Sequence, residues 1–147
     1  MDITKSSRHQ KIIGNFGENL VCNWLSRSGF EVALVDQVGM DIIASHPSLP
    51  GKPLGITVNA RTRTKGTEGT QVTVFRGNDR EKLLQVCETF RCEPWIAVYV
   101  EATECADAYL TSLDNYDRSY RRRERRVVDD WKMRDKDRRQ YDADPNV

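Results

Sequence analysis

One apolar run in the second half of the chain limits the possible folds more than any other feature. Residues 94–101 read PWIAVYVE, with hardly a polar interruption. A strand with one solvated face alternates between apolar and polar residues, whereas a strand buried on both faces reads as a continuous apolar run. The run therefore predicts a central strand in a sheet that is covered on both sides.

Two amphipathic helices are predicted that could cover this sheet. From His9 to Ser28 the apolar residues recur at intervals of three and four, and Gly29 follows as a natural helix end. The segment from Asp79 to Phe90 has the same spacing, and Asn78 precedes it at the position of an N-cap. Each segment therefore predicts a helix with one buried face.

Five further runs have the composition of β-strands and are separated by turn residues. They are residues 30–36, 41–45, 54–62, 70–75 and 108–113. The segment HPSLPGKP is rich in proline and glycine and predicts a loop between the second and third runs. The order of helix, strands, helix and strands predicts an α/β fold with a central mixed sheet flanked by helices.

The net charge of +1 hides an uneven distribution of charge along the chain. Residues 118–139 contain 11 basic and 5 acidic residues, a net charge of +6, whereas residues 1–117 have a net charge of −3. The length of 147 residues suits one domain. We expect an α/β domain over residues 1–113 and a charged, helical C-terminal extension over residues 114–147, packed on the same domain or appended to it.

An arginine-rich run, RRRERR, occupies residues 121–126 of this extension. Charged runs usually form a solvated face. With tyrosines close by, Arg121, Arg122 and Arg123 could instead contact the phosphate backbone of a nucleic acid. Both interpretations stay open.

The composition also predicts the compartment. The first residues, MDITKSSRHQK, lack the apolar stretch of a secretory signal, and no run approaches the roughly 18 apolar residues of a membrane span. We therefore expect a cytoplasmic protein with no membrane contact. Its four cysteines are then expected to be reduced and to pack as small apolar residues, since their spacing does not match a zinc site.

Polar residues cluster around two of the predicted strands. Asp41 opens one strand, and Asn59, Arg61 and Arg63 alternate on one face of the next strand. Glu18 lies on the first helix among glycines that allow a helix to approach a strand closely. Each residue also has an ordinary interpretation: Asp41 as a turn cap, Glu18 as a solvated helix residue and the arginines as edge-strand charges.

The combination of carboxylates and arginines suits phosphodiester chemistry. In such sites carboxylates hold Mg²⁺, which lowers the pKa of a bound water and stabilises the charge of the transition state. A lysine usually orients the attacking water, and arginines bind the phosphates. This interpretation needs the helix and the two strands to meet at one end of the sheet.

The segments FGENLVCNWLSRSGFEV, GMDIIA and LGITVNARTR resemble, in order and spacing, the PD-(D/E)XK nuclease superfamily, which includes Holliday-junction resolvases and many restriction endonucleases. The resemblance covers residues 9–101 and implies a restriction-endonuclease-like core. It also implies DNA as the partner, Mg²⁺ as the cofactor of an active enzyme and no small-molecule cofactor; a homodimer is left open. The positions that match the catalytic motif are Glu18, Asp41, Thr57 and Asn59, with Glu18 and Asp41 as metal ligands.

The third-strand motif departs from the pattern of the superfamily. The pattern has a carboxylate or an amide at position 57 and a lysine at position 59, whereas this chain has Thr57 and Asn59. Either the site has decayed and still binds nucleic acid, or Asn59 is a natural or engineered replacement in an active scaffold. Lys52 or Lys65 could take over the role of the lysine.

We therefore predict a nuclease-related protein that binds nucleic acid and, if active, hydrolyses DNA with Mg²⁺. The residues expected to bind phosphate are Arg61, Arg63, Lys65, Arg121, Arg122 and Arg123. The alternative is an inactive module of the same fold that serves as a DNA- or protein-binding scaffold.

Overall fold

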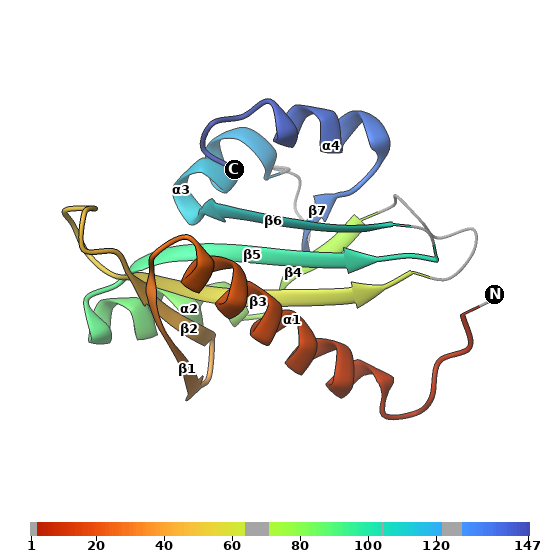
Figure 1. Cartoon of the computed structure of the whole chain (residues 1–147), viewed down its shortest axis with the longest axis horizontal. Coiled ribbons are helices and arrows are strands. Elements are labelled where there is room, and N and C mark those ends of the chain that lie inside the picture. The colour runs from red at the N-terminus through yellow and green to blue at the C-terminus, as the bar shows by residue number, and fades with distance from the viewer. Residues whose placement is uncertain (1–2, 64–70, 104, 122–127) are drawn as a thin grey trace.

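The computed structural model describes residues 3–63, 71–103, 105–121 and 128–147. A five-stranded sheet with the order β1-β2-β3-β5-β6 forms its centre, and a two-stranded sheet, β4-β7, lies beside it (Figure 1). The elements are α1 (His9–Arg27), β1 (Glu31–Gln37), β2 (Met40–Ser45), β3 (Leu54–Thr62), β4 (Gln71–Arg76), α2 (Asp79–Phe90), β5 (Glu93–Glu101), β6 (Ala106–Ser112), α3 (Leu113–Asn115), η1 (Tyr116–Tyr120), β7 (Val128–Lys132) and α4 (Asp135–Asp142).

The apolar run of the sequence forms β5, which lies between β3 and β6. β5 runs parallel to β3 over nine residue pairs, and the other neighbouring strands of this sheet are antiparallel. Ile96, Ala97 and Val98 are fully buried although their side chains alternate between the two faces. The predicted α/β fold with a central mixed sheet flanked by helices is therefore confirmed.

Helix α1 covers one face of the sheet through a stripe of small and apolar residues. Val21 and Leu25 pack against Ile42 and Ile56 of the sheet. A Cβ atom built on Gly17 would lie 2.6 Å from the Cβ of Ala60, so only a glycine allows the helix axis this close to β3. The close approach predicted from the glycines of this helix is present.

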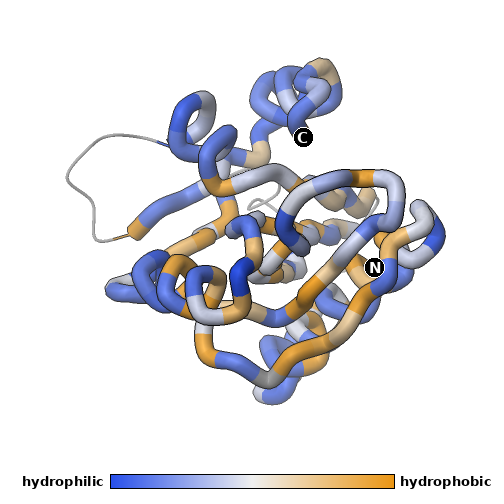
Figure 2. The backbone as a smooth tube through the Cα atoms, turned by 90° about the vertical axis from the view of Figure 1, so that its left-hand side faces the viewer, coloured by the Kyte–Doolittle hydropathy of each residue, from blue (hydrophilic) through white to orange (hydrophobic). Residues whose placement is uncertain are grey.

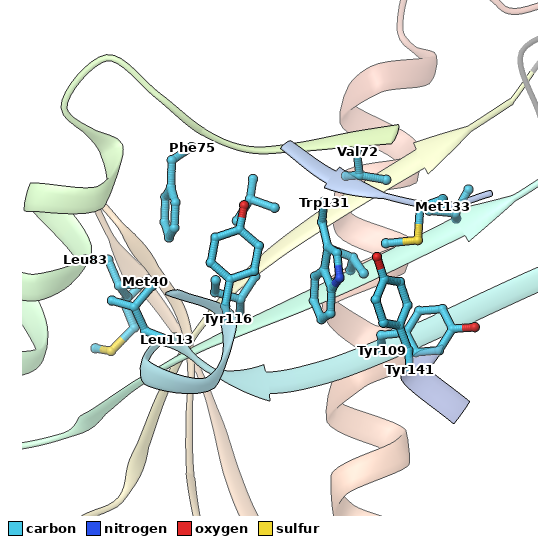
Figure 3. Packing of buried hydrophobic residues seen from close by; sticks show 14 of the residues in the cluster. Met40, Val72, Phe75, Leu83, Tyr109, Leu113, Tyr116, Trp131, Met133 and Tyr141 are labelled. Atoms are coloured by element: carbon cyan, nitrogen blue, oxygen red, sulfur yellow. The ribbon is translucent and has the colours of Figure 1, made fainter. Parts of the chain in front are cut away.

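The other face is covered by α2, by β4-β7 and by the C-terminal residues (Figure 3). Trp131 on β7 is fully buried, and its ring is 5.3 Å from that of Tyr141 and 5.7 Å from that of Tyr116. The rings of Tyr109 and Tyr120 complete this aromatic cluster.

The sequence predicted a charged helical extension after residue 113, and this prediction is only partly right. The extension contains the strand β7, and its aromatic residues belong to the main core. The residues around the C-terminus are largely hydrophilic (Figure 2), and the few that pack into the core, such as Trp131 and Tyr141, are large and buried. The domain boundary at residue 113 stays a prediction.

Strands β2 and β3 separate soon after the loop that joins them. They pair only where Ile42, Ile43 and Ala44 face Ile56, Gly55 and Leu54. Beyond Ile56, the side of β3 that faces away from β5 pairs with no other described strand. We call this unpaired side of residues 57–62 the β3 edge. None of the helices in the described ranges is long and apolar enough to cross a membrane.

Candidate functional site

Asp41 lies in the gap where β2 and β3 separate. Its Oδ2 atom accepts a hydrogen bond of 2.6 Å from the backbone N–H of Val58 and one of 3.3 Å from the hydroxyl of Thr57. Burial raises the pKa of Asp41, and these two hydrogen bonds partly oppose the increase. Asp41 therefore links β2 to β3 at the point where the strands separate. Its buried position disfavours the charged form of its carboxyl group.

Glu18 reaches the same region from α1. Burial raises the pKa of Glu18, and the negative charge of Asp41 raises it further. The charge of Glu18 in turn contributes to the raised pKa of the Cys22 thiol. The structure thus brings the predicted carboxylate pair, Glu18 and Asp41, within electrostatic range at the β3 edge.

The predicted polar residues of β3 lie on the face opposite α1. Val58 and Ala60 are the β3 side chains that a Cβ atom on Gly17 would meet, so the alternating residues Asn59 and Arg61 point to the other face. There the neighbouring strand β5 places Val98 beside Asn59 and Val100 beside Arg61, and both valines belong to the core covered by α2 and β4. We call Asn59, Arg61 and Arg63 the donor row.

The donor row carries positive charge with no counterpart among the described acidic residues. The pKa of Arg61 is lowered by burial and by the charge of Arg76, the last residue of β4. Burial and the charge of Arg61 lower the pKa of Arg63. None of the ion pairs between described residues includes any of these three arginines.

Several hydrogen-bond donors of the row are buried and unpaired. Within the described residues, Asn59 Nδ2 and the Nε and Nη2 atoms of Arg63 have no acceptor. Arg61 donates from Nη1 to the carbonyl oxygen of Ala60 at 2.7 Å. An unpaired buried donor costs about 1–3 kcal/mol, and more when it is charged. The row therefore has the properties of a site that takes up an anion.

Among the described residues, the donor set around Asp41 offers a Mg²⁺ ion two carboxylates, Asp41 and Glu18, and no third one from β3. Mg²⁺ takes six oxygen ligands in octahedral geometry. No group of three or more histidine, cysteine, aspartate or glutamate residues in the described ranges could hold a metal. Thr57 donates its hydroxyl to Asp41 instead of offering a carboxylate, and Asn59 presents a buried N–H donor. Glu18 and Asp41 would therefore hold the ion without the third-strand ligand that the resemblance implies, and water or phosphate oxygens would complete its coordination.

The remaining predicted residues lie away from this site or outside the described residues. Lys65, Arg122 and Arg123 are outside them. Arg121 donates from Nε to Asp129 at 3.1 Å, so it is paired within the C-terminal segment. Lys52 is exposed in the loop before β3. Five residues of strand from Leu54 to Asn59 span about 17 Å, so Lys52 does not reach the position of the missing lysine.

A cavity of about 320 Å³ lies beside the end of β3, and nothing in the sequence indicated it. It is lined by Lys5, His9 and Arg61 among others. The hydroxyl of Thr62 donates to Glu101, so the 2.8 Å bond between that hydroxyl and His9 has the imidazole as its donor. His9 and Lys5, which donates to the carbonyl oxygen of Thr62, hold the start of the chain against β3.

No family model and no curated protein matches this chain. Among solved structures, the chain is similar to Hjc from Archaeoglobus fulgidus, a Holliday junction resolvase from an archaeal hyperthermophile. The TM-score is 0.56, the sequence identity is 17%, and the match covers 84% of this chain and 85% of that chain. Identity at this level shows the fold alone, and the predicted restriction-endonuclease-like fold is confirmed.

Proposed function

We propose that this protein binds nucleic acid, and specifically DNA, on a nuclease fold whose hydrolytic site is impaired. The observation that carries the proposal is the donor row. Buried N–H donors of Asn59 and Arg63 have no acceptor among the described residues, and the guanidinium groups of Arg61 and Arg63 form no ion pair with them. Phosphate oxygens are the acceptors that nucleic acids offer to such groups. The similarity in fold to a Holliday junction resolvase supports DNA as the ligand.

The impairment follows from the two departures on β3. Asn59 is neutral and cannot place a cation next to an attacking water, which is the role the resemblance assigns to a lysine at this position. Thr57 cannot act as the missing carboxylate, since its hydroxyl donates to Asp41. Hydrolysis of DNA with Mg²⁺, implied by the resemblance, is therefore expected to be slow or absent.

A protein-binding scaffold is the alternative that the sequence left open. Unpaired, partly buried arginines favour a phosphate-bearing ligand over an apolar protein surface, because an apolar surface would leave the donors of Arg63 unpaired. The proposal keeps the cytoplasmic location predicted from the sequence. The four free cysteines support it, because disulfides are rare in that compartment.

The test measures the binding of a fluorescent DNA duplex and a four-way junction at several salt concentrations. Arg61→Gln and Arg63→Gln are each expected to weaken binding and to reduce the slope of log K against log salt by about one. Arg27→Gln is the matched control, because it removes one arginine charge from the exposed end of α1. Failure of the wild-type protein to bind either DNA at low salt would refute the proposal.

Hydrolysis is tested separately by plasmid nicking with Mg²⁺ or Mn²⁺. We expect no nicking by the wild-type protein and a gain of nicking by the double variant Thr57→Glu/Asn59→Lys, which restores both groups. Adding Asp41→Ala to the double variant should abolish that gain. Nicking by the wild-type protein that Asp41→Ala abolishes would show that the site is intact as it stands.

A further inference from the structure

The cavity beside the end of β3 has walls from two distant parts of the chain. One wall is the segment before α1 together with the first turns of that helix, and the other is the end of β3. Its volume of about 320 Å³ lies at the lower end of the range of small-molecule sites. The cavity therefore has room for a group about the size of one nucleotide.

The cavity is separate from the carboxylate pair. Thr62, which lines it, lies four residues along β3 from Val58, whose backbone N–H donates to Asp41. Four residues of strand span about 13 Å. The described residues that line the cavity include neither Glu18 nor Asp41.

Positive groups line the cavity from both walls. Lys5 and His9 belong to the first wall, and Arg61 comes from β3. The described residues of the lining include no aspartate or glutamate, and neither Lys5 nor Arg61 forms an ion pair with a described residue. Helix α1 starts at this wall without an acidic residue in its first turn, so its dipole adds to the positive potential. The cavity therefore favours an anion.

The positive groups are held in place and still have donors to offer. Lys5 donates to the carbonyl oxygen of Thr62, and His9 donates from Nε2 to the hydroxyl of Thr62 at 2.8 Å. These bonds use one donor of the Lys5 ammonium and one of the imidazole, and Arg61 uses one of its five for a backbone carbonyl. Lys5 is exposed, and no atom of Arg61 is among the buried unpaired ones. A ligand can therefore reach the other donors without breaking these bonds.

Neutral side chains complete the lining. Ser6, Ser7 and Gln10 are exposed and offer hydroxyl and amide donors. Ile13 and Ala60 are buried and provide an apolar surface within the same cavity. Charged and hydroxyl donors suit phosphate oxygens, and an apolar surface suits the sugar or base joined to the phosphate.

We propose that this cavity is a nucleotide pocket for a phosphomonoester group, which a free nucleotide and the phosphorylated end of a DNA strand share. A phosphomonoester carries about 1.5–2 negative charges at neutral pH, more than the single charge of a phosphodiester inside a strand. The three positive groups therefore favour it over the DNA backbone. For a DNA end, the inference rests on the proposed function and adds a preference for phosphorylated ends. For a free nucleotide, it adds a ligand that competes with DNA through Arg61.

The first experiment uses dAMP as the probe, with calorimetry and thermal unfolding as readouts. We expect dAMP to bind one to one and to raise the melting temperature, whereas deoxyadenosine, which lacks the phosphate, does neither. Lys5→Gln and Gln10→Glu should each weaken dAMP binding about tenfold or more, because one removes a positive donor and the other adds a negative charge.

Lys11→Gln is the matched control for these variants. Lys11 is exposed on α1 and does not line the cavity, so dAMP binding should stay within about twofold of wild type. An equal loss in Lys11→Gln and Lys5→Gln would reduce the effect to general attraction by surface charge and would overturn the inference.

The second experiment compares one DNA duplex with 5′-phosphate, 3′-phosphate or hydroxyl ends. We expect one kind of phosphorylated end to bind about tenfold more tightly than hydroxyl ends. Lys5→Gln should remove this difference and leave the affinity for closed circular DNA, which has no ends, within about twofold of wild type. The melting temperature of each variant without ligand shows that it is folded before its binding is compared.

The two experiments distinguish the two sources of the phosphate and the two proposals. Binding of dAMP without an effect of end phosphates supports the pocket with a free nucleotide as its ligand, and the reverse result supports it with a DNA end. If DNA binds but neither dAMP nor an end phosphate has an effect, the inference is overturned and the proposed function stays in place. If dAMP binds and DNA does not, the pocket stands and the proposed function fails.

Discussion

The close approach of α1 to β3 leads to a prediction that uses two glycines of the same helix. A Cβ atom on Gly17 would lie 2.6 Å from the Cβ of Ala60, whereas a Cβ atom on Gly14 would meet nothing within 4 Å. Non-bonded carbon atoms are comfortable at about 3.5–4.0 Å, so Gly17→Ala must push α1 outwards by roughly 1 Å. Overpacking of this kind costs about 1–3 kcal/mol.

Replacement of a glycine by alanine within a helix also gains about 0.5–1 kcal/mol. This gain is common to both positions, so Gly14→Ala isolates it and the difference between the variants isolates the packing cost. We expect Gly14→Ala to be slightly more stable than wild type. We expect Gly17→Ala to be less stable than Gly14→Ala by about 1–3 kcal/mol.

Urea denaturation followed by fluorescence and circular dichroism measures both free energies of unfolding. For a chain of this size the difference corresponds to about 2–4 °C in melting temperature for each kcal/mol. Equal stability of the two variants would refute the packing argument.

Three further predictions concern the core and the carboxylate pair. Trp131→Ala should lower the free energy of unfolding by about 3–5 kcal/mol in urea denaturation, because the ring is fully buried among tyrosines; a change below about 1 kcal/mol would exclude the C-terminal segment from the core. Tyr116→Phe should leave the free energy of unfolding unchanged or raise it by at most about 1 kcal/mol, because the buried hydroxyl has no partner among the described residues. Asp41 has a pKa raised in the folded state, so the stability that its protonated form contributes to wild type is lost as the pH rises through that pKa, whereas Asp41→Asn has no such group to lose. Unfolding measured from acid to neutral pH should therefore shift in favour of Asp41→Asn as the pH rises, and a constant difference would contradict the raised pKa.

The sequence predicted the regular elements well where the signal is local. Residues 54–62 and 79–90 are the strand and the helix that were expected there, because apolar periodicity is read over a few turns or residues. Asn78 is the N-cap residue of α2, as predicted, but the capping bond expected from its side chain does not form. Asp79 instead accepts from the backbone N–H of Arg76.

The features that the sequence missed depend on distant contacts. Strand β7 contains two aspartates and a lysine, and nothing in its local pattern indicates that Trp131 is enclosed by rings from β6, η1 and α4. Glu18 and Asp41 could be predicted as a pair because Gly17, next to Glu18, allows α1 to approach β3 closely.

Trp131 and Tyr141 follow the strands and the helix that they cover, and this order has a consequence for folding during synthesis. Domains fold as the chain emerges from the ribosome, from the N-terminus onwards. Here the apolar face formed by β5, β6 and α2 stays uncovered until β7 and α4 have emerged. The nascent chain therefore keeps this apolar face exposed to solvent until β7 and α4 have been made, and the core is completed only at that point.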